Sequence, residues 1–161
     1  MSNTPAEHKE ENQKLAADSY VDLFQIVLRS GSRVYLKNNN DRDWQGNTYE
    51  GTSIKLSEVR RSSDEEQSRP TLSIANPKGI YSPLIRDGDL DRATLIRYRV
   101  LSKNLTNNLA VFERNSWTFW RPTLITGEVA TFELRQPLDG YNFTTPARTF
   151  SPPEFPAVSL T

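Results

Sequence analysis

The sequence predicts a mainly β protein of antiparallel strands, with a helix before them and an extended arm after them. Apolar and polar side chains alternate in several short runs between residues 20 and 135, which is the pattern of half-buried strands. Residues typical of turns separate these runs. Four prolines crowd residues 146–161 and argue against a further strand there.

The first segment, residues 1–19, is a polar leader that contains a helix start. Thr4 can cap the helix, Pro5 fits its first position, and Glu7 completes a capping box. The residues that follow are good helix formers with almost no apolar stripe. We therefore expect this helix to need a neighbouring surface to hold it.

The middle segment, residues 20–141, carries the strands. In the first of them Phe24, Ile26 and Leu28 share one face, whereas Leu23 lies on the other. Strands are expected at residues 20–29, 33–37, 54–59, 69–75, 93–101, 117–125 and 128–135. The same alternation places Ala130, Phe132 and Leu134 together on one face of the last strand.

Turn-forming residues separate the strands. They lie at Gly46 between Trp44 and Tyr49, at Asn76-Pro77, at Ser82-Pro83 and at Thr126-Gly127. The first predicts a tight turn between two strands, and the last predicts a hairpin. Between residues 76 and 88 only short helical turns fit, and Ser82-Pro83 can start one.

The last segment, residues 142–161, is a proline-rich arm that also holds Phe143, Phe150 and Phe155. Proline has no backbone N–H and favours extended chain, so these phenylalanines are not expected to be buried by strand alternation. We expect Phe150 and Phe155 to dock into apolar pockets on a neighbouring subunit, with Arg148 paired to an acidic group there.

Composition excludes several classes of protein. Twenty basic and twenty acidic residues give a formal net charge of zero, so no global field attracts nucleic acid or an anionic membrane. The absence of cysteine excludes disulfides, zinc–thiolate sites and iron–sulfur clusters. No apolar run is long enough to span a membrane, and the chain begins with a polar stretch, so we expect a soluble protein that is not exported.

Two features suggest metal or acid–base chemistry only weakly. His8 is the one histidine of the chain and lies in the polar leader, so we expect it to be solvated and not catalytic. The run from Asp87 to Asp91 is similar to a calcium loop but lacks the distal glutamate of an EF-hand, so we expect a turn. We therefore expect no cofactor.

An aromatic group in the last two strands leaves an alternative open. Trp117, Phe119 and Trp120 lie near three glutamates in the sequence, which are Glu113, Glu128 and Glu133. Such a group could form a carbohydrate-binding or glycan-cleaving site with paired carboxylates. Strand aromatics are more often core or interface residues, which is the interpretation we favour.

Arg97 and Arg99 alternate with apolar residues and are expected on an exposed strand face. They could contact phosphates. Because the net charge is zero and aspartates lie just upstream, ion pairs with another protein are the better explanation.

The ordered set of motifs resembles the minor tail protein L family of long-tailed bacteriophages. The residues that carry the resemblance are the Trp44–Tyr49 turn, the Arg69-Pro70-Thr71-Leu72 strand with its Asn76 exit, the arginine-bearing 93–101 strand, Trp117, the Val129–Leu134 strand with its Gln136-Pro137 exit, and Pro146-Ala147-Arg148. Each motif is short, but together they cover nearly the whole chain. Family members usually continue into a cysteine-rich domain that binds an iron–sulfur cluster, so this cysteine-free chain is similar to a short form.

The resemblance implies an antiparallel, tail-tube-like β-barrel or sandwich and a structural, non-enzymatic role in the virion. Such a protein would be assembled in the host cytoplasm into the tail tip or baseplate, between the distal tail protein and the central hub or receptor-binding protein. It would form a homo-oligomeric ring, expected to be a trimer, with DNA only as cargo passing through the lumen and with no membrane contact. The alternative is another tube or baseplate subunit of similar fold. We expect Arg97, Arg99, Arg148, Phe150 and Phe155 at the interfaces.

Overall fold

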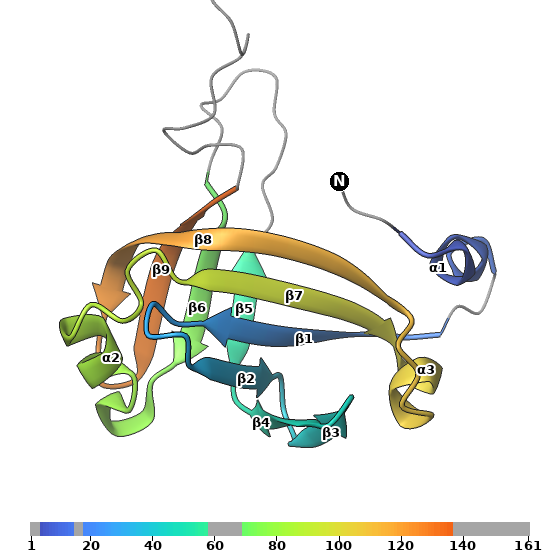
Figure 1. The fold of residues 1–161 in the computed structure, drawn as a ribbon, viewed down its shortest axis with the longest axis horizontal. Helices are drawn as coiled ribbons and strands as arrows, with labels where there is room; N and C mark the ends of the chain where they lie inside the picture. The colour runs from blue at the N-terminus through green and yellow to red at the C-terminus, as the bar shows by residue number, and fades with distance from the viewer. Residues whose placement is uncertain (1–3, 15–17, 58–68, 137–161) are drawn as a thin grey trace, which may run out of the picture.

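The computed structural model describes residues 4–14, 18–57 and 69–136 and places nine strands in one sheet (Figure 1). The strands are β1 (Tyr20–Val27), β2 (Arg33–Lys37), β3 (Arg42–Trp44), β4 (Asn47–Gly51), β5 (Ile54–Ser57), β6 (Thr71–Ala75), β7 (Thr94–Leu101), β8 (Phe112–Ile125) and β9 (Val129–Arg135). Their order across the sheet is β3-β4-β2-β1-β7-β8-β9-β6-β5. The predicted mainly β fold is confirmed, with one short parallel pair, β2 with β4, that the sequence did not predict. The predicted arm, residues 142–161, lies outside the described residues.

The sheet folds over on itself, so that β5, β6 and β9 cross β1, β2 and β7 steeply (Figure 1). The long strand β8 joins these two layers, because its first half pairs with β7 and its second half with β9. The register shifts twice in the second pairing, between Phe119 and Arg121 and between Pro122 and Leu124. Such irregularities bend a strand, and they accommodate Pro122, which has no N–H to donate to the ladder.

The main core lies between the two layers. Phe24 and Ile26 of β1 and Leu95 of β7 contribute to it from one layer, and Ile74 of β6 and Phe132 of β9 contribute from the other. Each of these side chains is at most 3% exposed. The alternation predicted for the first and last strands is confirmed, because the residues predicted to face together are the ones buried in this core.

A second core lies on the opposite face of β1 and β7. Leu23 packs there with Trp44, Tyr49 and Val100, and the β3–β4 hairpin covers it. The predicted tight turn is confirmed: both of its central residues have positive φ, 49° at Gln45 and 76° at Gly46, which is the conformation of the type I′ hairpin turn. The indole Nε1 of Trp44 donates a hydrogen bond of 3.2 Å to the carbonyl of Leu109, which fixes the hairpin against the segment that follows α3.

Four short helical segments lie at the edges of the sheet: α1 (Ala6–Glu11), the 3-10 turn η1 (Pro77–Gly79), α2 (Ser82–Arg86) and α3 (Ser102–Thr106). The short helix predicted at Ser82-Pro83 is confirmed as α2, whereas α3 was not predicted. The capping box predicted for α1 does not form: its N-cap is Pro5, and no side chain caps it. None of the helices in the described ranges is long and apolar enough to cross a membrane.

Candidate assembly interfaces

Arg99 lies on β7 in a polar part of the sheet, opposite Asp22 of β1 and Glu113 of β8. Its Nε donates to Asp22 Oδ1 at 2.9 Å and its Nη2 to Oδ2 at 3.2 Å, and its guanidinium lies 6.0 Å from the centre of the Tyr20 ring. These contacts orient the guanidinium, and the side chain remains 31% exposed. Its role at an interface stays a prediction.

Arg97 is not on an exposed face, and that expectation is wrong. The residue is only 6% exposed, and its guanidinium lies 5.4 Å from the centre of the Trp117 ring. The register explains this burial, because Arg97 lies opposite Phe24 on the face of β1 and β7 that forms the main core. The interface role of Arg97 stays a prediction. The other predicted interface residues, Arg148, Phe150 and Phe155, lie outside the described residues.

The aromatic side chains of β8 do not form one sugar-binding platform. Phe119 is 2% exposed in the main core. Trp117 lies beneath Arg97. Trp120 is 37% exposed, but the Arg135 guanidinium lies 3.1 Å from the centre of its ring. The structure therefore covers the two tryptophans separately, each with a cation of a neighbouring strand.

Two of the three glutamates near these aromatic residues, Glu133 and Glu113, are also engaged separately. Glu133 accepts hydrogen bonds from Arg69 Nη1 at 3.0 Å and from Arg121 Nε at 2.6 Å. Burial alone would raise the pKa of Glu133, but these two arginines outweigh it and hold the pKa below its usual range. A carboxyl group with a lowered pKa is a poor general acid, and Glu113 is bonded instead to Asn115 on its own strand.

An open groove of about 370 Å³ lies between the β3–β4 hairpin and α3. Its acidic side chains are already hydrogen-bonded within the β3–β4 region: Asp41 accepts a hydrogen bond from Gly51 N at 2.6 Å, and Asp43 accepts one from Thr48 Oγ1 at 2.6 Å. Within the described ranges no group of three or more histidine, aspartate or glutamate side chains could hold a metal ion.

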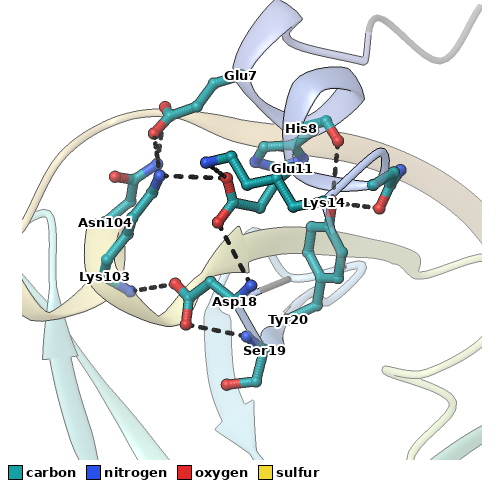
Figure 2. A network of polar contacts seen from close by, with 10 residues as sticks. Glu7, His8, Glu11, Lys14, Asp18, Ser19, Tyr20, Lys103 and Asn104 are labelled. Atoms are coloured by element: carbon teal, nitrogen blue, oxygen red, sulfur yellow. Dashed lines mark hydrogen bonds and ion pairs between the residues drawn. The ribbon is translucent and has the colours of Figure 1, made fainter. Parts of the chain in front are cut away.

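The helix α1 is held against α3 by polar contacts (Figure 2). Lys103 Nζ lies 2.9 Å from Glu7 Oε1 and 3.7 Å from Glu11 Oε2, and Asn104 Nδ2 donates to Glu7 Oε2 at 3.1 Å. The hydrogen bond from Lys103 is the main reason that the pKa of Glu7 lies below its ordinary value, and the same bond raises the pKa of Lys103. The backbone N–H of Lys103 donates to Asp18 Oδ2 at 2.9 Å. The expected need for a neighbouring surface is thus met by ion pairs on α3.

His8 is buried by this docking, so the expectation of a solvated histidine is wrong. It is 1% exposed, and its ring packs edge-on against Tyr20 with the ring centres 5.3 Å apart. Neither ring nitrogen has a hydrogen-bond partner in the part of the chain that the structure describes. Sequence reasoning missed this because α1 lacks an apolar stripe. The nearest signal was Tyr20, whose hydroxyl donates to the His8 carbonyl at 3.2 Å.

Comparison with known proteins gives one family and one fold. A family profile described as phage minor tail protein L matches residues 31–152, which is more than half of the chain. No curated protein matches the sequence. A solved structure titled "Virion of native gene transfer agent (GTA) particle" contains a chain with a similar fold, at a TM-score of 0.61 and 13% identity. The match covers 84% of this chain and 46% of that one, so this chain spans less than half the length of its structural relative. The extent of the family match shows that the chain belongs to the phage minor tail protein L family.

Proposed function

We propose that this chain is a non-enzymatic structural component of the phage tail tip. In this role it links the distal tail ring to the central hub or receptor-binding protein, around the channel through which DNA leaves. The observation that carries the proposal is the family match over residues 31–152. The similar fold of a chain in a gene transfer agent virion is consistent with it.

The structure suits a ring subunit in two respects. The folded-over sheet has two cores, which give a rigid body, and the β8–β9 hairpin ends in exposed apolar side chains. A ring subunit needs such a body, together with surfaces that meet unlike surfaces on the next copy. We propose a homotrimer, and native mass measurement of purified tail tips would show three copies. Six copies would favour another tube or baseplate subunit.

A map of the tail tip by electron cryo-microscopy tests the position. The expected result is this fold in a ring between the distal tail protein and the hub. Density for the chain elsewhere in the particle, or none in the particle, contradicts the proposal.

Deletion of residues 146–161 tests the role of the arm. Both cores lie within residues 20–136, so the truncated chain should keep its circular dichroism spectrum and melting temperature while tails fail to assemble. Unfolding of the truncated chain would mean that the arm belongs to this domain's own core. Normal tail assembly would mean that the arm is dispensable.

A further inference from the structure

The end of the β8–β9 hairpin exposes three large apolar side chains: Leu124 is 53% exposed, Ile125 is 44% and Val129 is 36%. Leu124 lies opposite Thr131, so Leu124 and Val129 are diagonal neighbours on one face. Ile125 lies opposite Ala130 and therefore faces the other side of the hairpin, so we name Leu124 and Val129 the hairpin-tip patch. Apolar side chains grouped on an exposed surface are typical of a contact site.

Asn76 holds this hairpin end in place. It is fully buried, its backbone N–H donates to the Glu128 carbonyl at 2.6 Å, and its Nδ2 donates to the Thr126 carbonyl at 2.8 Å. Its Oδ1 accepts a hydrogen bond of 2.8 Å from the N–H of Tyr81. The hairpin end is therefore tied to the η1–α2 loop before any partner arrives, which lowers the entropy lost on binding.

An acidic side chain borders the patch. Glu128 is exposed and precedes Val129. Among the described residues no basic side chain forms an ion pair with its carboxylate. The hairpin end thus offers an apolar surface with one available negative charge.

We infer that the hairpin-tip patch binds the proline-rich arm, residues 142–161, of a neighbouring copy of this chain. Phe150 covers the patch, and Arg148 pairs with Glu128. In an extended chain residues i and i+2 point to the same side, about 7 Å apart, so one arm presents both groups together. The inference rests on the proposed role of the chain in a ring and names the surface that receives the arm.

The neighbouring copy is chosen because the proposed ring joins unlike surfaces of successive copies, although the roughly 14 residues from Gln136 to Phe150 are also long enough to reach the chain's own hairpin tip. The last described residue, Gln136, follows the far end of β9, which the length of that strand places about 20 Å from the hairpin tip. The end of the described chain at Gln136 and the patch therefore lie at opposite ends of the β8–β9 hairpin (Figure 1). Unlike surfaces at opposite ends of a subunit meet head to tail; such contacts close into a ring when the rotation between copies closes, and otherwise they extend into a filament.

A cysteine cross-link tests the contact, because the natural sequence has no cysteine. One full-length variant carries Gly127→Cys, where a side chain meets no atom within 4 Å. A second carries Pro146→Cys, which lies on the same side of an extended chain as Arg148 and Phe150. Both substitutions leave the patch, Glu128 and Phe150 intact. The two variants are mixed, oxidised and run on a non-reducing gel, both as purified chain at high concentration and in tails assembled from the mixture. Leu109→Cys replaces Gly127→Cys as the control, because it is 47% exposed and follows α3 at the other end of the sheet (Figure 1).

The expected result is a disulfide-linked dimer with Gly127→Cys and none with Leu109→Cys. Adding Phe150→Ala to the Pro146→Cys chain should lower the yield at least about tenfold, as expected for loss of a buried phenyl ring. Incorporation of both variants into tails without a dimer in either sample overturns the docking and leaves the proposed tail function standing. If a chain carrying both cysteines forms only an internal cross-link, the arm binds its own hairpin and the assignment to a neighbour is wrong. If the variant chains are not found in the tails, the proposed tail function is contradicted. The cross-link in the purified sample then tests the contact between arm and patch by itself.

Discussion

Asn76→Ala should destabilise the fold more than its small change in volume suggests. The substitution removes two hydrogen bonds of 2.8 Å, one to the Thr126 carbonyl and one from the Tyr81 N–H, and a longer one of 3.2 Å to Ser82 Oγ. Each is worth about 1 kcal/mol net, and the Tyr81 N–H loses its acceptor in a partly buried place. Because solvent can reach Thr126 and Ser82, the total loss should be about 2–3 kcal/mol. For a domain of this size that lowers the melting temperature by roughly 5–10 °C.

Calorimetry of the purified chain measures this loss, and hydrogen exchange locates it. The amide of Tyr81 should exchange faster in the variant, because its acceptor is gone. Asn115→Ala is the matched control: its side chain is half-buried and donates one hydrogen bond of 3.2 Å to Glu113, so its cost should stay below about 1 kcal/mol. If Asn76→Ala lowers the melting temperature no more than Asn115→Ala does, Asn76 does not hold the hairpin end as argued.

Three further changes test other parts of the structure. Gly51→Ala should lower the free energy of unfolding by about 2–4 kcal/mol, because its Cβ would lie 2.0 Å from the Asn39 backbone oxygen and the loop must move. An unchanged midpoint of urea unfolding would contradict this close approach. Lys103→Ala should release α1, which would be seen as faster proteolysis near the N-terminus. The natural chain should show the same release as the pH falls below 4.5, the ordinary pKa of Glu7. The pKa of Glu7 is lowered in the folded chain, so its stabilisation is present above that pH and is lost as the pH falls below it. His8→Leu should raise unfolding stability by about 1 kcal/mol, because it removes two buried nitrogens that have no partner in the described part of the chain; a loss of stability would show that the imidazole is satisfied.

The strand pattern is local information, and the sequence alone determined it. Period-two alternation separated Phe24 and Ile26 from Leu23, and the structure places them in two different cores. The turn at Gly46 and the β8–β9 hairpin were likewise readable, because a few neighbouring residues decide such turns. These features follow from the backbone preferences of short segments, whatever packs around them.

Only the tertiary structure decided which faces are covered. Arg97 and Arg99 read alike in the sequence, yet the first lies over Trp117 in the core layer and the second remains partly exposed. His8 is buried because α1 docks on α3, a contact between residues nearly one hundred positions apart. The parallel pairing of β2 with β4 also depends on how the chain returns to the sheet. Whether a side chain is buried depends on residues far away in the sequence. Alternation shows which face of a strand a residue is on, but it does not show what packs against that face.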